Sequence, residues 1–136
     1  MLKETVIAAL EATFGAEVTL TPSSREFACF DAKHPDVGNV MIEDDGTELT
    51  VSVGNIHHGH FASYEDNLSE EEHAEVIAKD VVSFSTDLFD DKYLLYKSRW
   101  GGGWSHVDDG FKKTMLPGRK SWFKWSGPIK PEDLSY

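Results

Sequence analysis

Apolar residues recur along this chain with a helical period in two places. The first run has four-residue spacing and ends at Gly15; its members are Leu2, Val6, Leu10 and Phe14. The second run marks one face of residues 69–90; its members are Ile77, Val81, Phe84 and Leu88. Ser69 and Glu72, three residues apart, have the spacing of a capping box. We therefore expect an N-terminal helix and a long central helix of about five turns that covers a sheet.

Between the two helices the period changes to two, which is typical of strands. Strands are predicted at residues 17–21, 26–32 and 56–62, and a hairpin is predicted at residues 38–53. Asp45-Gly46 fits the two-residue turn of that hairpin, because such turns need a positive φ at both central residues.

After the central helix, KYLLYKS predicts a buried strand, WGGGW a flexible loop, and KSWFKWS a last strand that Gly127-Pro128 closes. Alternation predicts that Tyr93 and Leu95, or instead Leu94 and Tyr96, are buried, with Trp100 and Trp104 partly exposed. Residues 129–136 are expected to form a loose tail.

These elements predict one α+β domain over residues 1–136. The expected architecture has two layers. An antiparallel sheet of about five to seven strands packs on the two helices, in the order α-β-β-β-β-α-β-β.

Charge is distributed unevenly along the chain, and the net value is −11. Residues 1–91 carry 20 acidic and 4 basic side chains, whereas residues 92–136 carry 4 acidic and 9 basic ones. The net charge argues against nucleic acid as a partner of the chain as a whole. The acidic part favours a protein partner of opposite charge.

The sequence also bears on the compartment. Cys29 is the single cysteine, so no intrachain disulfide forms. No run of apolar residues is long enough for a membrane helix, and the N-terminus lacks a signal-peptide pattern. We expect a cytoplasmic protein that does not bind membranes.

The stretch GNIHHGHFASYE, residues 54–65, holds three histidines within four positions. On a strand, His58 and His60 share one face and His57 points to the other. Such a pair can supply two ligands to a transition metal, with Glu65, Asp66 or His106 as candidates for the third. The alternative is an ordinary strand with half-exposed histidines. We expect no tightly bound metal and no cofactor, and a hydrogen-bonded cluster of the pair with an acid such as Glu65.

The spacing His58-x-His60-x4-Glu65 resembles the first half of the cupin metal motif. The remainder of the motif is missing: Gly54 stands two residues too close, and no second motif with a distant histidine follows. A long helix directly after the site also does not suit a jelly roll, so the cupin assignment is rejected.

Three functions follow from these features. The first is a binding or adaptor protein, since the size, acidity and element order resemble those of small secretion chaperones and toxin-immunity proteins. The second is a metal-assisted enzyme with His58 and His60 as ligands. The third is a small-ligand or sugar-binding module in which Gly102 lets Trp100 and Trp104 approach one surface. A homodimer is compatible with all three.

Overall fold

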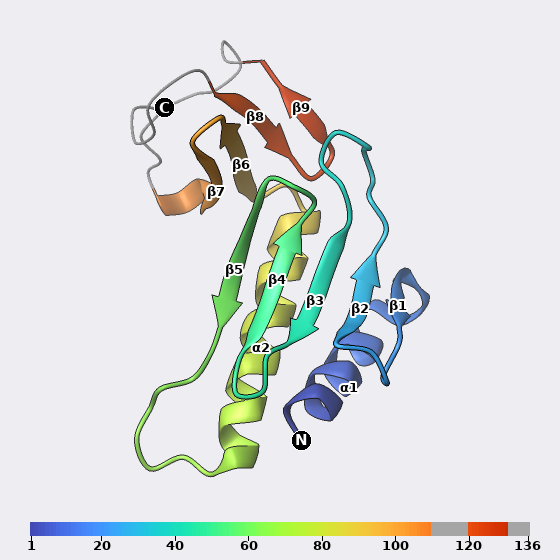
Figure 1. Cartoon of the computed structure of the whole chain (residues 1–136), viewed down its shortest axis with the longest axis vertical. Coiled ribbons are helices and arrows are strands. Elements are labelled where there is room, and N and C mark those ends of the chain that lie inside the picture. Colours follow the sequence, from blue (N-terminus) through green and yellow to red (C-terminus); the bar gives the residue numbers. More distant parts are fainter. Residues whose placement is uncertain (110–119, 131–136) are drawn as a thin grey trace.

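Two helices lie where the apolar periodicity predicts them, in a computed structural model that describes residues 1–109 and 120–130. Helix α1 spans Leu2–Phe14 and α2 spans Glu70–Phe89. Ser69 caps α2: its hydroxyl accepts the Glu72 N–H, and the Glu72 carboxylate accepts the Ser69 N–H, both at 3.1 Å. The two helices lie behind a sheet and share its apolar core (Figure 1).

The first sheet has five antiparallel strands in chain order. They are β1 (Val18–Leu20), β2 (Glu26–Phe30), β3 (Val40–Asp44), β4 (Leu49–Val53) and β5 (His57–Phe61). Ile42 pairs with Val51, and both are fully buried against the helices, whereas Met41 and Ser52 pair on the opposite, more open face. The predicted hairpin is therefore confirmed, and β5 is left as an edge strand.

The turn of this hairpin differs from the prediction by one residue. The Asp45 N–H donates to the Glu48 carbonyl at 3.0 Å, so Gly46 and Thr47 stand at the tip. Gly46 has φ 96°, but Asp45 is not among the non-glycine residues with positive φ. The expected turn with two positive φ values at Asp45-Gly46 is thus wrong, because only the glycine takes that conformation.

The second sheet has four antiparallel strands in the order β7-β6-β8-β9. They are β6 (Tyr93–Ser98), β7 (Gly101–His106), β8 (Ser121–Lys124) and β9 (Gly127–Ile129). Leu94 and Leu95 are both fully buried, which corrects the expected alternation. Leu95 joins the main core, while Leu94 packs with Trp122 on the other face, so β6 is covered from both sides.

The α+β class with an N-terminal and a central helix is confirmed, but the strands divide between two sheets rather than one. Two local predictions are wrong. Residues 101–103, expected as a flexible loop, are paired residues of β7, and Gly127-Pro128 begins β9 instead of closing the last strand. Of the predicted tail, Ile129 belongs to β9, and residues 131–136 lie outside the described part of the chain.

The glycines of β7 lie close to atoms of other segments of the chain. Gly103 pairs with Tyr96, and a Cβ at residue 103 would stand 2.4 Å from the Tyr96 hydroxyl oxygen. The Tyr96 ring therefore lies over Gly103, and a side chain at residue 103 would require the ring to move. Glycine is used here for close packing and not for mobility.

Neither described helix is long and apolar enough to cross a membrane.

Candidate functional site at the open edge of the first sheet

The histidines of β5 alternate as predicted. His58 and His60 lie exposed on the open face of the first sheet, with ring centroids 5.5 Å apart. His57 is half-buried on the opposite face, where its ring centroid lies 4.7 Å from that of Trp104. The extended conformation of β5 therefore accounts for the directions of all three side chains.

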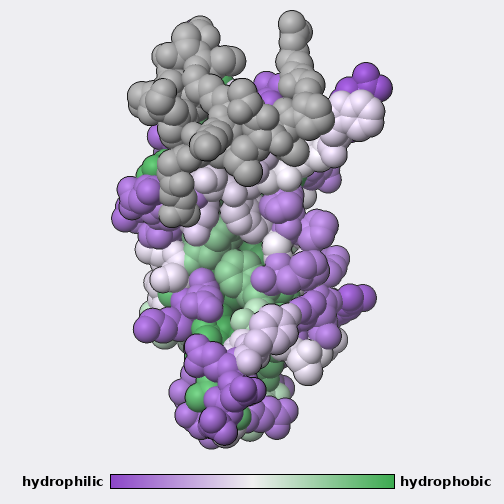
Figure 2. Space-filling model, turned by 90° about the vertical axis from the view of Figure 1, so that its left-hand side faces the viewer, coloured by the Kyte–Doolittle hydropathy of each residue, from purple (hydrophilic) through white to green (hydrophobic). Residues whose placement is uncertain are grey.

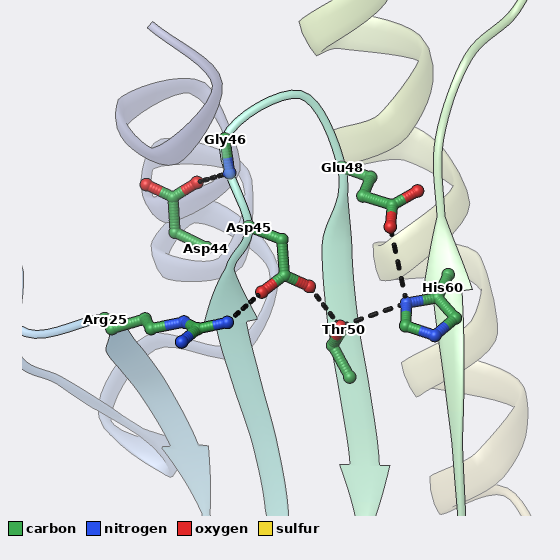
Figure 3. Close-up of polar contacts among 7 residues, drawn as sticks. All are labelled: Arg25, Asp44, Asp45, Gly46, Glu48, Thr50 and His60. Carbon is green, nitrogen blue, oxygen red and sulfur yellow. Dashed lines mark hydrogen bonds and ion pairs between the residues drawn. The ribbon is translucent and has the colours of Figure 1, made fainter.

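One end of this face carries a continuous polar network (Figure 3). Arg25 Nη2 lies 2.7 Å from Asp45 Oδ1, and the Thr50 hydroxyl bonds Asp45 Oδ2. On its other side, Thr50 Oγ1 lies 3.1 Å from His60 Nδ1, which is 3.6 Å from Glu48 Oε1. The network thus crosses the sheet from the start of β2 to β5.

The directions of the protons in this network follow from the charges. Hydrogen bonds from Arg25 and then Thr50 hold the pKa of the Asp45 carboxyl below its ordinary value of 3.8, so it acts as an acceptor. Thr50 has one hydroxyl hydrogen, which it donates to Asp45, and its oxygen can then accept the Nδ1–H of His60. Nε2 of a neutral His60 consequently keeps its lone pair.

The strand register explains why these residues meet. Thr50 of β4 pairs with His60 of β5, and the β3–β4 turn places Asp45 and Glu48 at the same end of the sheet. The sequence pattern predicted the hairpin and the strand but not their relative register. The sequence therefore did not predict Asp45, Glu48 and Thr50 as neighbours of His60, although Asp45-Gly46 indicated the hairpin turn.

The predicted metal ligands are only partly brought together. Within the described residues, a group able to hold a metal ion consists of Asp45, Glu48 and His60, whose ligand atoms lie within 4.8 Å of one another. His58 and Glu65 are not members of that group. Both Asp45 oxygens are already bonded, by Arg25 and Thr50, so a metal would have to displace a partner.

His106, another candidate third ligand, has a different position. Its Nε2 lies 3.1 Å from Asp87 Oδ2, and its Nδ1 accepts the Asp108 N–H at 3.2 Å. Both ring nitrogens are therefore engaged, and the neutral ring carries its proton on Nε2. Lys92 Nζ lies 3.8 Å from the same Asp87 carboxylate and offsets its negative charge at the C-terminal end of α2, where the helix dipole disfavours it. The contact between His106 and Asp87 links β7 to α2.

A groove lies between β5 and α2, beside the polar network. Its lining residues are His60, Phe61, Ala62, Asp80, Ser83, Phe84, Asp87, Tyr93 and Trp104. The Phe84 ring lies 5.5 Å from Phe61 and 4.8 Å from Trp104, centroid to centroid, which makes an aromatic floor. Figure 2 views the side that faces left in Figure 1 and shows apolar surface bounded by polar residues.

The residues of the proposed aromatic platform have separate neighbours. Trp100 is 66% exposed at the β6–β7 turn, where its ring centroid lies 5.2 Å from Arg99 Cζ. Trp104 is half-buried in the groove, above Gly59. Both are partly exposed, as predicted. Gly102 lies against the Ile56 carbonyl and so serves packing.

Comparison with protein-family models, with curated proteins and with solved structures found no match to this chain.

Proposed function

We propose that this protein binds a basic protein partner, which contributes an extended segment to the open edge of β5. The observation that carries the proposal is the groove beside that edge, which has an aromatic floor and the carboxylates of Asp80 and Asp87 among its lining residues. An edge strand offers unpaired backbone groups to another chain, and the adjacent groove receives its side chains.

Charge favours a basic partner over a second copy of this chain. Residues 1–91, which include the whole first sheet and α2, carry 20 acidic and 4 basic side chains. Two such surfaces repel each other, whereas a basic segment is attracted and its association is accelerated. Within the described ion pairs Asp80 has no cationic partner, so it is available to a lysine or arginine of the binding segment.

The experiment is a titration of the labelled protein with an extended peptide of alternating lysine and valine, followed by amide chemical shifts. We expect shifts concentrated at residues 57–62 and 80–87, with affinity that falls as salt rises. Asp80→Lys should weaken binding about tenfold, because it replaces an attractive charge with a repulsive one. Glu75→Lys, an exposed acid on α2 outside the groove, is the matched control. Shifts confined to other surfaces would contradict the proposal.

The cluster of Asp45, Glu48 and His60 favours a second candidate, a metal-dependent activity at the end of the first sheet. Three protein ligands leave a coordination position for water, as catalytic zinc sites do. Titration with Zn²⁺ by calorimetry tests it. His60→Ala should abolish binding while His58→Ala retains it; equal binding by both variants would exclude this site.

A further inference from the structure

A second concave site lies between the two sheets, and it shares no described lining residue with the groove at β5. It is a cleft of about 650 Å³, within the size range of small-molecule sites. One wall comes from the connections after β2 and β4, at residues 35–38 and 54–56. The other comes from β6, β8 and β9. Figure 1 shows the β2–β3 connection rising to the level of β9.

Close backbone contacts hold the first wall in place. A Cβ at Gly54 would stand 2.1 Å from the Val37 carbonyl oxygen, and one at Gly38 would stand 2.6 Å from the Gly54 Cα. Ile56 is held in turn by Gly102 of β7, across the junction of the sheets. Because these contacts leave no room for side chains, the two connections form a fixed surface, and the cleft exists without a ligand.

The lining of the cleft combines apolar side chains with polar groups, and its cations come from neighbouring strands. Ile56 is 5% exposed and Trp122 is 6% exposed, and Phe123 and Ile129 extend the apolar lining. Lys97 pairs in register with Ser121, which places Lys120 beside it at the same end of the sheet. Both lysines line the cleft.

These two lysines have no counterion among the described residues. No ion pair among residues 1–109 and 120–130 involves Lys97 or Lys120. Among the described lining residues one carries a carboxylate: Asp36, whose side chain is 61% exposed and lies 3.9 Å from His34 Nδ1. Within the described part of the chain, two cations without a counterion therefore lie beside apolar side chains, although the net charge of the chain is −11.

We propose that this cleft binds a small amphipathic organic anion. Lys97 and Lys120 hold its carboxylate, sulfonate or phosphate, and Ile56, Phe123 and Ile129 cover its apolar body. The polar groups fix the orientation of the charged end, and burial of the apolar end supplies affinity. This site is separate from the groove at β5, and the two proposals stand or fall independently.

The test uses the full chain and a pair of fluorescent probes with similar apolar bodies. The anionic probe is 8-anilinonaphthalene-1-sulfonate, and the uncharged one is N-phenyl-1-naphthylamine. We expect saturable one-to-one binding of the anion and at least about tenfold weaker binding of the neutral probe. Amide shifts induced by the anion should map to residues 54–56 and 121–123.

The variant Lys97→Gln with Lys120→Gln should weaken binding of the anion about tenfold or more. The matched control, Lys124→Gln with Lys130→Gln, removes the same charge outside the cleft and should leave binding unchanged. Circular dichroism checks that both double variants fold. Equal affinity of the two double variants, equal affinity of the two probes, or shifts that map elsewhere would each overturn the proposal.

Discussion

Gly102 of β7 lies directly against the carbonyl oxygen of Ile56, the residue that precedes β5. A Cβ at residue 102 would stand 1.9 Å from that oxygen and 2.9 Å from the Tyr96 carbonyl oxygen. The neighbouring Trp104 covers Gly59 in the same way, with Cζ2 only 2.7 Å from where a Cβ would be. Two glycines, one from each sheet, therefore set how closely the sheets approach.

Gly102→Ala should destabilise the protein by about 3 kcal/mol or more, at the upper end for overpacking, because the obstruction is backbone and cannot rotate away. Urea unfolding measures this loss. Ser105→Ala in the same strand adds no atom and should cost less than about 1 kcal/mol. Equal effects of the two substitutions would show that the sheets are not packed through Gly102.

Phe84→Ala should cost about 3–5 kcal/mol, as large-to-small changes in a core do. The Phe84 side chain is 5% exposed and its ring contacts those of Phe61, Tyr93 and Trp104. Thermal and urea unfolding give the loss. The control is Lys79→Ala on the exposed face of α2, which should change stability by less than about 0.5 kcal/mol. A melting temperature close to that of the wild type would contradict the placement of Phe84 in the core.

Ser85→Ala should raise stability by about 1 kcal/mol. The Ser85 hydroxyl oxygen is buried and has no hydrogen-bond partner among the described residues, so folding removes it from water without compensation. Alanine also has the higher helix propensity. Ser83→Ala, exposed on the same helix, isolates that propensity and should gain only about 0.5 kcal/mol. A loss of stability in Ser85→Ala would mean that the hydroxyl is bonded.

Elements with a strong local signal could be predicted from the sequence. The helix stripes, the Ser69 cap and the alternation of His57 and His58 depend on a period or a short spacing, and the structure has them all. The second sheet had no such signal in β7, because residues 101–103 have no side chains to alternate. Tertiary packing against Ile56 and Tyr96, rather than turn formation, explains these glycines.

Only part of the candidate site could be predicted from the sequence, for a related reason. The spacing within β5 gave His58 and His60 from local geometry alone. Asp45 and Glu48 reach His60 through the pairing of β4 with β5, a register that residues 49–61 permit but do not specify uniquely. The sequence pattern predicted Glu65 as the acidic partner because it is close to His60 in the sequence. The structure instead places Glu48 beside His60.

Arg25→Gln should raise the pKa of the Asp45 carboxyl toward its ordinary value, because the Arg25 hydrogen bond is the largest cause that lowers it. A carboxyl group whose pKa is lowered in the folded state stabilises the fold at a pH above its ordinary pKa. This stabilisation is lost as the pH falls through the pKa of the folded state. Since the Arg25 side chain is 70% exposed, that loss is small and the titration is the better readout. Carbon-13 NMR of the Asp45 carboxyl measures it, with Lys3→Gln as control. An unmoved Asp45 titration would contradict the pairing.

Acid should weaken the fold through His57 in particular. Burial, and secondarily the charge of His58, lowers the pKa of His57 below its ordinary value of 6.5. As the pH falls through 6.5, the unfolded chain therefore takes up a proton at this residue before the folded chain does. The unfolded state then binds more protons, so the free energy of unfolding decreases, and the decrease ends once the pH is below the folded pKa.

His57→Gln removes this titration and keeps a polar side chain beside Trp104. The variant and the wild type should differ in stability by a constant amount above about pH 7.5, because His57 is then neutral in both states. Below about pH 6 the difference should shift in favour of the variant, whose residue 57 takes up no proton. Urea unfolding from pH 8 to pH 5 measures the shift, and the other histidines cancel because both proteins contain them. His60→Gln is the control for an exposed histidine on the same strand, because its charge is not among the causes that lower the His57 pKa. Parallel pH profiles of the wild type and His57→Gln would show that the His57 ring is hydrated, and that Trp104 does not cover it as the 4.7 Å separation of their centroids indicates.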